Sequence, residues 1–123
     1  MGFREHLQDV CRAVEGAVAC SLMGIDGIEV DTHLVSDAPA EVAIDLRSLL
    51  VEYSTVLRGA REAADVHQAG DLSEFSINTE KLMTVARLVS PEYFMVVALA
   101  PDGNYGKARY VLRITAPRVR SEL

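Results

Sequence analysis

Apolar side chains recur at helical spacing through the segment from Asp37 to His67. Pro39 is tolerated in a first helical turn, and Ser36 or Asp37 before it can accept hydrogen bonds from the free N–H groups of that turn. Two neighbouring apolar stripes follow the segment, and together they predict one long helix. The first stripe contains Val42, Leu46, Leu49, Tyr53, Val56, Ala60 and Ala63, and the second contains Ala43, Leu50, Leu57 and Ala64.

Two adjacent stripes make an apolar face wider than a helix needs in order to cover one sheet. We therefore expect one stripe to pack on the helix's own domain and the other to meet a second copy of the chain. The alternative is a long helix buried on two sides within one domain. Gly59 lies late in the same helix, and it either opens a small-residue patch to a close partner or is a tolerated glycine without a role.

Both ends of the chain also have helical periodicity. A first helix is predicted over residues 2–15, ended by Gly16. A last helix is expected after Asn104, which can cap it, and Pro117 is expected to end or kink it so that the six following residues fray. The apolar faces of these helices contain Phe3, Leu7, Val10, Cys11 and Val14 at one end, and Tyr105, Ala108, Val111, Leu112 and Thr115 at the other.

The remaining segments predict strands. Residues 17–23 are small or apolar, as in a buried strand, and the sequence Gly24-Ile25-Asp26-Gly27 after them is typical of a hairpin turn. Residues 28–35 alternate, which predicts a strand with one face in solvent. The expected faces are Ile28, Val30, Thr32 and Leu34 on one side, and Glu29, Asp31, His33 and Val35 on the other.

Three more strands are expected in the second half of the chain. The segment 71–81 keeps no strict alternation, so we expect a bulge or a shifted start there. Residues 82–89 and 93–100 are two apolar strands joined by a turn at Ser90-Pro91-Glu92. Short connections make neighbouring strands antiparallel. The order predicts an α+β sandwich of three layers over residues 1–123 as one domain, with a five-stranded antiparallel sheet, the long helix on one face and the terminal helices on the other.

Composition narrows the class of partner. The net charge of −6 argues against non-specific binding to nucleic acid or to an anionic membrane. From Tyr105 onward, however, the sequence contains five basic residues and one acidic residue. The last helix therefore either contacts an acidic partner or an anionic lipid, or exposes its charges to solvent. Hydrophobic residues make up 50% of the chain, and in so small a domain part of that apolar surface is expected in an interface.

Cys11 and Cys20 each lie within an apolar pattern and form no CxxC motif, which predicts buried thiols in a reduced, cytoplasmic protein. The N-terminus has no basic segment followed by an apolar run, so no secretory signal is expected. The most apolar window, residues 82–100, approaches the length of a membrane span. It contains Arg87, Glu92 and the Ser90-Pro91 break, and therefore predicts two buried strands rather than a span.

No set of residues with catalytic or ligand-binding spacing is found. His6, His33 and His67 fall in three different elements without metal-ligand spacing, and we expect His6 and His33 to be surface residues. Cys11 shares a stripe with Leu7, which favours core packing over a nucleophile. No phosphate-binding GxxxxGK[ST] motif occurs. We therefore predict no catalytic residue, no cofactor and no metal site. A role as a small-molecule sensor is also less favoured, because only 6% of the residues are aromatic and could line a ligand pocket.

Charged residues of the long helix have two interpretations each. Glu41 and Asp45 lie one turn apart, where carboxylates either shift each other's pKa or favour the helix N-terminus. The arginines can contact an acidic partner or reach a partner's nucleotide as an arginine finger, or they can form ion pairs along the helix with Glu52, Glu62 or Asp65. The arginines in question are Arg47, Arg58 and Arg61.

Three segments resemble the roadblock/dynein light chain domain family, and within it the small bacterial type represented by the gliding-motility protein MglB. The segments are Gly24-Ile25-Asp26-Gly27-Ile28-Glu29-Val30, Leu57-Arg58-Gly59-Ala60-Arg61-Glu62-Ala63-Ala64 and Pro101-Asp102-Gly103-Asn104-Tyr105-Gly106-Lys107-Ala108. Order and spacing of the elements carry the resemblance over nearly the whole chain. The sequence lacks the extended acidic C-terminal tail of some MglB-like proteins, which leaves a platform role rather than MglB-type activity.

The resemblance implies a sheet order of 2-1-5-4-3 and a homodimer in which the third strands pair edge to edge and the long helices lie side by side. It also implies a non-catalytic platform that binds a small Ras-like GTPase and modulates its nucleotide cycle. The alternative is a structural adaptor of a larger signalling or motility assembly, which acts through the basic last helix without GTPase contact. The predicted interface consists of Leu46, Leu49, Tyr53, Val56, Ala60, Leu72, Phe75 and Ile77.

Overall fold

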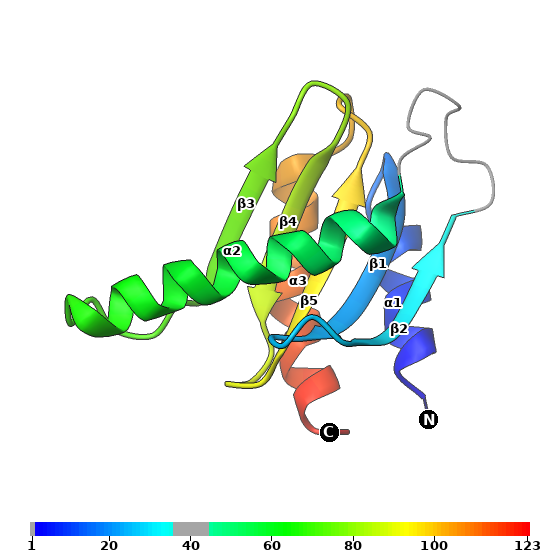
Figure 1. Ribbon diagram of the computed structural model, residues 1–123. Helices are drawn as coiled ribbons and strands as arrows, with labels where there is room; N and C mark the ends of the chain where they lie inside the picture. Colours follow the sequence, from blue (N-terminus) through cyan, green and yellow to red (C-terminus); the bar gives the residue numbers. More distant parts are fainter. Residues whose placement is uncertain (1, 36–44) are drawn as a thin grey trace.

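The structure, a computed structural model of the chain, describes residues 2–35 and 45–123. Within these ranges the sheet has the order β2-β1-β5-β4-β3, and all neighbouring strands are antiparallel. Helix α2 crosses one face, while α1 and α3 cover the other (Figure 1). The elements are α1 (Phe3–Ala13), β1 (Ala17–Gly24), β2 (Glu29–Leu34), α2 (Leu46–Val66), β3 (Glu74–Asn78), β4 (Met83–Leu88), β5 (Tyr93–Leu99) and α3 (Tyr105–Arg120). The predicted three-layer α+β sandwich and strand order are confirmed.

Apolar side chains fill the space on both sides of the sheet. Under α1 and α3, Leu7 and Leu112 pack with Leu22 of β1 and are fully buried. Under α2, Leu57 packs with Phe94 of β5. Each such side chain contributes about 1.5–3 kcal/mol by leaving water, so the inner faces of the three helices hold the layers together.

Two glycines set the predicted ends of elements. Gly16 follows α1 with a φ of +87°, and a Cβ there would lie 2.4 Å from the Cα of Gly103, so only glycine fits. Gly27 has a φ of +91° in the turn between β1 and β2. In that turn the N–H of Gly27 donates to the carbonyl of Gly24 at 2.9 Å, as the hairpin prediction required.

Helix α2 begins later than predicted. Asp45 has a non-helical ψ of 87°, and its carboxylate accepts hydrogen bonds from Ser48 N at 3.2 Å and Ser48 Oγ at 2.8 Å. It is therefore the N-cap of a helix that starts at Leu46, so the expectation of an unbroken helix from Asp37 is wrong. The proposed caps around Pro39 and the Glu41–Asp45 pair involve residues outside the described ranges.

Pro117 does not end α3. The helix continues to Arg120, and Val119 is fully buried, so the prediction of a frayed end is wrong. Inside a helix, proline loses its own N–H bond to the preceding turn, and its ring crowds the carbonyl four residues earlier. Burial of Ala116 and Val119 under α1 offsets that loss because both belong to the core on this side of the sheet.

Strand β2 departs from the predicted alternation. The β1–β2 register shifts between Leu22 and Met23, so that Leu22 lies opposite Asp31 while Met23 lies opposite Glu29. This bulge inserts Val30 and brings Glu29 to the same face as Thr32, whose Oγ1 donates to the Glu29 carboxylate. The expected faces are therefore wrong at the start of the strand. Strand β3, by contrast, starts late at Glu74 and pairs with β4 without a register shift.

Candidate interaction surface

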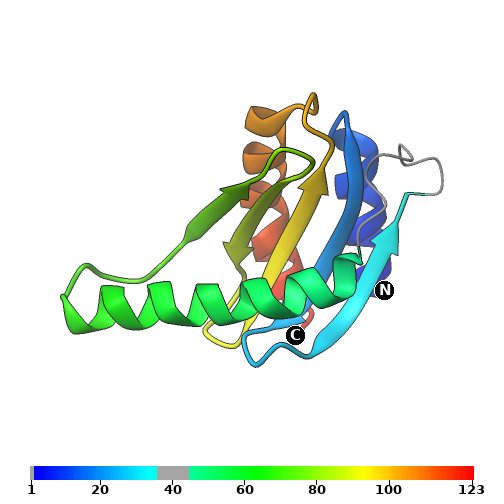
Figure 2. The same cartoon turned by 45° about the horizontal axis from the view of Figure 1, so that its top comes forward.

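Helix α2 extends past the edge of its own sheet. Its C-terminal half projects beyond β3 in both views (Figures 1 and 2). Its buried residues are Leu50, Ser54 and Leu57, and no residue from Arg58 to Val66 is buried. A short helical end without tertiary packing is marginally stable in water. The projecting half of α2 is therefore a surface that the described residues leave uncovered.

The two apolar stripes of α2 differ in what they contact. Leu50 and Leu57 of the second stripe are 3% and 1% exposed against the sheet. In the first stripe, Tyr53 is half-buried against the same cluster, while Leu46 and Leu49 are half-buried against a second apolar cluster. Val56 is 50% exposed, and Ala60 is half-buried without belonging to that core. The N-terminal half of the helix is thus largely covered within the chain, as the single-domain alternative expected, whereas the C-terminal half is not.

Strand β3 forms the open edge next to the projecting helix. Leu88 N donates to Ser73 O at 3.0 Å and Thr79 N donates to Leu82 O at 2.8 Å. In an antiparallel ladder, alternate residues direct their backbone groups to the same neighbour. Glu74, Ser76 and Asn78 therefore direct their N–H and C=O groups away from β4, toward the open edge. Such an edge readily accepts a further strand.

Three apolar residues of the predicted interface flank this edge. Leu72 and Phe75 are half-buried against the core under α2. Ile77 is half-buried and, two residues after Phe75, lies on the same face of the strand. The structure thus brings the second half of α2 and the edge of β3 together on one side of the molecule, which periodicity alone did not show.

Gly59 lies on the uncovered half of α2. A Cβ built there meets nothing within 4 Å. The small residues beside it, Ala60, Ala63 and Ala64, are half-buried or exposed. Nothing within the described ranges therefore explains a glycine at this position, and the small-residue patch stays a prediction.

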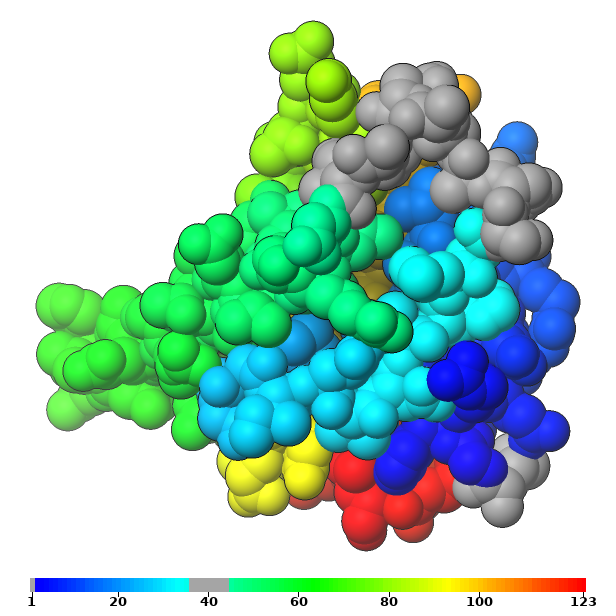
Figure 3. Space-filling model, turned by 45° about the vertical axis from the view of Figure 1, so that its right-hand side comes forward, coloured from blue at the N-terminus to red at the C-terminus, as the bar shows by residue number. Residues whose placement is uncertain are grey.

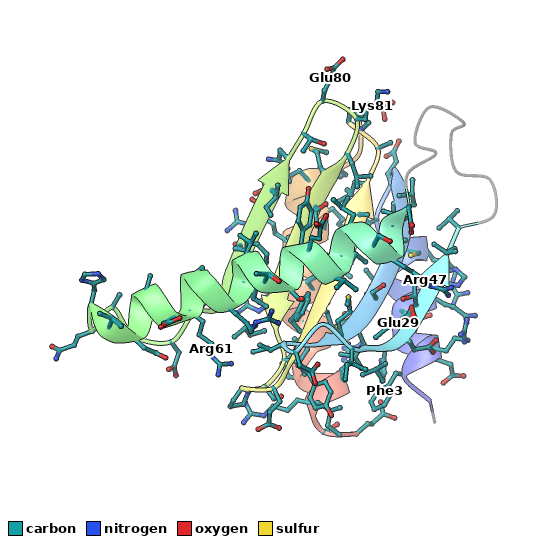
Figure 4. The ribbon with its side chains drawn as sticks, in the orientation of Figure 1. Phe3, Glu29, Arg47, Arg61, Glu80 and Lys81 are labelled. Carbon is teal, nitrogen blue, oxygen red and sulfur yellow. The ribbon has the colours of Figure 1, made fainter. Side chains whose placement is uncertain are left out.

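The arginines of α2 bind parts of their own chain. Arg58 donates to the carbonyl of Ile25 in the β1–β2 turn, and Arg61 donates to the carbonyl of Pro91 in the β4–β5 turn. Both arginines therefore connect α2 to turns between strands of its own sheet. Arg47 forms an ion pair with Glu29 at 3.3 Å, and Figure 4 shows the two side chains next to each other. Among the described residues none of the three pairs with an acid of α2, so the expected ion pairs along the helix are wrong. Sequence periodicity missed these contacts because the acceptors belong to distant segments.

Described residues line a hollow at each end of α2. A cavity of about 440 Å³ lies between its projecting half, the segment before β3 and the β4–β5 turn. Its lining includes Arg61, Asp65, Asp71 and Arg120, two charges of each sign. A smaller cavity of about 180 Å³ lies where the start of α2 meets β2, on the face shown in Figure 3. The larger cavity is polar and open beside the free edge of β3, so it belongs to the same candidate surface.

The chemistry of the described residues gives little support to catalysis. Burial raises the pKa of the Cys11 thiol to about 11, and burial raises the pKa of Cys20 well above its ordinary value, so both thiols are unreactive core residues. Within residues 2–35 and 45–123, no group of three or more His, Cys, Asp and Glu side chains could hold a metal ion. In the same ranges, no helix is long and apolar enough to cross a membrane.

His6 departs from the predicted surface position. Its side chain is buried, and its Nε2 contacts the carboxylate of Glu122 after α3. The reason is tertiary: the ordered end of α3 covers a side of α1 that helical periodicity marks as polar. His33 is half-buried and His67 is exposed at the end of α2, which keeps the three histidines apart as expected.

No protein-family model and no curated protein matches the chain. Among solved structures, MglC from Myxococcus xanthus is 54% identical, with both chains covered completely and a TM-score of 0.72. A Roadblock/LC7 domain from Streptomyces avermitilis is 13% identical, with a TM-score of 0.79 and 96% and 94% of the two chains covered. An MglB structure described as having a tetrameric arrangement is 15% identical, with a TM-score of 0.83 and coverage of 96% and 85%.

The last two similarities establish the fold, and the identity to MglC establishes kinship over the full length. The chain therefore belongs to the roadblock/LC7 family, in agreement with the resemblance of its hairpin, its long helix and the start of its last helix.

Proposed function

We propose that the protein is a non-catalytic homodimeric platform that regulates or recruits another protein. The observation that carries this proposal is the projection of α2 past the open edge of β3 (Figure 2). A second copy that pairs its own β3 at this edge would extend the sheet beneath the projecting helix. The same contact would place the two α2 helices side by side, so one association covers both exposed features.

The first candidate client is a small Ras-like GTPase, whose nucleotide cycle the dimer would modulate. The resemblance to the roadblock family implies such a client, and the paired α2 helices would offer a broad docking surface. Arg58 and Arg61 already bind backbone carbonyls of their own chain, so they are poorly placed to enter a partner's nucleotide site. Regulation would therefore work by ordering the GTPase's own residues. The two free, buried cysteines support a cytoplasmic location.

Light scattering of the purified protein tests the dimer, which should have twice the mass of the chain at micromolar concentration. Co-purification with a small Ras-like GTPase of the same organism, in GDP and GTP-analogue states, tests the client. Hydrolysis measured with and without the dimer then distinguishes activation from scaffolding. A compact monomer would contradict the platform, and a dimer that binds the GTPase in no nucleotide state would exclude this client.

The second candidate is a structural adaptor that contacts a larger assembly through α3. The helix exposes Tyr110 and Ile114, and the Arg113 guanidinium lies 5.6 Å from the Tyr110 ring centroid. A cation beside exposed apolar groups suits an acidic, partly apolar partner. Arg113→Glu should abolish recruitment and leave the dimer intact, whereas Arg109→Glu would also remove a contact to β3. Unchanged recruitment in Arg113→Glu would remove α3 from consideration.

A further inference from the structure

We propose that the smaller cavity beside α2 binds a primary ammonium group on a short aliphatic chain, either a free amine or the side chain of a lysine on another protein. In this arrangement the ammonium group lies against Ser21, Thr32 and Glu29 at the floor of the cavity. The inference does not depend on the homodimer proposed above, because residues of a single chain line the cavity.

The cavity lies where the start of α2 meets β1 and β2, on the face shown in Figure 3. Its volume is about 180 Å³. A cavity of about 150 Å³ in another protein holds a molecule of benzene, so a chain of about five heavy atoms fits here. Part of the lining is aliphatic and consists of Met23 from β1 and of Leu50 and Val51 from α2. These side chains can pack on methylene groups but donate no hydrogen bond.

Two hydroxyl groups form the floor of the cavity. Ser21 and Thr32 are buried, and they lie directly opposite each other on β1 and β2. Ser21 Oγ lies 2.6 Å from Thr32 Oγ1, and Thr32 Oγ1 also donates to the Glu29 carboxylate. Polar side chains are seldom buried this deeply unless they are hydrogen-bonded, and among the described residues these two bond to each other and to Glu29.

The direction of these hydrogen bonds determines what the cavity can bind. A hydroxyl group has one proton to donate, and a carboxylate has none. Because Thr32 donates its proton to Glu29, Ser21 must donate the hydrogen bond between the two hydroxyls. Both protons are then used, and only acceptor lone pairs remain at the floor. An acceptor-only floor with a negative charge suits an ammonium group, which has three N–H donors and a positive charge.

Arg47 already places a cation at the mouth of the cavity. Its side chain is mostly exposed, and its Nε lies 3.3 Å from Glu29 Oε2 (Figure 4). Thr32 donates to the same oxygen, so among the described contacts Oε1 is left for a ligand. An exposed ion pair contributes little to stability, and the guanidinium group can therefore move aside. Arg47 and the ligand thus compete for one carboxylate.

Titration with n-butylamine hydrochloride, followed by the backbone amide signals in NMR spectra, tests the cavity. We expect saturable shifts of the signals of Ser21, Gly27 and Val51, which line it, with a Kd of about 1–10 mM for so small a ligand. n-Butanol has the same shape without the charge and should bind at least about tenfold more weakly. Equal binding of n-butanol, or shifts that do not saturate, would overturn the proposal.

Variants of the charged pair locate the ammonium group. Glu29→Gln keeps an acceptor for Thr32 but removes the charge, and it should weaken binding of n-butylamine about tenfold. Arg47→Gln removes the competing cation and should strengthen binding about threefold. Arg12→Gln removes another exposed ion pair, on α1, and is the matched control that should change nothing. Unchanged binding in Glu29→Gln, or weaker binding in Arg47→Gln, would overturn the assignment of the floor.

One further variant keeps the proposal testable if Glu29→Gln fails to fold. Ser21→Ala leaves the carboxylate in place and removes one acceptor, so it should weaken binding of n-butylamine about threefold. Unchanged binding in Ser21→Ala would overturn the role of the hydroxyl pair.

A second ligand distinguishes the two sources of the ammonium group. Nα-acetyl-lysine N-methylamide carries the same aliphatic chain on a peptide backbone. Binding within about threefold of n-butylamine would support a lysine side chain of another protein, whereas binding of n-butylamine alone would support a free amine. Failure of both ligands would overturn the proposal and leave the hydroxyl pair as a cross-strand contact, with no consequence for the homodimer.

Discussion

Glu74 of β3 and Arg109 of α3 form an ion pair across the edge of the sheet, with 2.6 Å between Oε2 and Nη2. The Arg109 Nε donates to the same oxygen at 2.8 Å, and Arg87 of β4 lies 3.6 Å from the other one. The Glu74 carboxylate raises the pKa of Arg109, which keeps the guanidinium charged. The ion pair connects β3, the open edge strand, to α3, which lies on the face of the sheet opposite α2.

Removal of this pair should loosen the edge strand. We expect Arg109→Gln to increase amide hydrogen exchange in β3 while the exchange of β1 and β5 stays unchanged, because only β3 depends on the contact. High salt should reproduce part of the effect in the unchanged protein, since exposed charges are screened. Equal increases in all strands would indicate global destabilisation and contradict this role.

The two halves of α2 should respond differently to substitution. Leu57→Ala should cost about 2–5 kcal/mol of folding stability, because Leu57 is 1% exposed and its removal leaves a cavity. Val56→Asp, one residue earlier on the exposed side, should leave the unfolding of the chain nearly unchanged but weaken self-association. Chemical denaturation and light scattering separate the two effects. A Val56→Asp variant that dimerises normally would exclude this position from the interface.

Gly59 within α2 and Gly70 after it provide a matched comparison. Gly59→Ala should stabilise the isolated chain by up to about 1 kcal/mol, since a Cβ there meets nothing and alanine favours helix. Gly70→Ala should destabilise it, because Gly70 has a φ of +94° that alanine rarely adopts. Thermal unfolding at low concentration measures both. If Gly59→Ala also weakens the dimer, a second helix approaches this position closely.

The N-cap of α2 should make stability depend on pH. Hydrogen bonds from Ser48 lower the pKa of the Asp45 carboxyl below its ordinary value of 3.8. A carboxyl with a depressed folded pKa contributes stability above its unfolded pKa and loses that contribution as pH falls through the folded pKa. The difference in Tm between the unchanged protein and Asp45→Asn should therefore be constant above about pH 5 and shrink below about pH 4. A difference that stays constant to pH 3 would contradict this contribution.

Local patterns predicted much of this molecule. Element order, the Gly24–Gly27 turn, the cap at Asn104 and the buried faces of all three helices were visible in the sequence, because each depends on periodicity or on the chemistry of a few adjacent residues. The predictions failed where contacts between segments far apart in the sequence decide the local structure or the burial of a side chain. Val119 keeps α3 helical beyond Pro117 through contacts in the core, and His6 is buried by the far end of the chain.

The sequence patterns by themselves determined the three-layer arrangement, since alternating and helical hydrophobic patterns admit few layered arrangements, whereas the strand order followed from the resemblance to the roadblock family. The patterns also showed that α2 has more apolar surface than one sheet requires. Only the tertiary structure decided where that surface remains free: Leu57 is buried against the sheet, whereas Val56 lies on a different side of the helix and Val66 lies in the half that projects past the sheet. The tertiary structure also determined the hydrogen-bond partners of Arg58 and Arg61. These partners are backbone carbonyls of distant segments, which no local pattern in the sequence can identify.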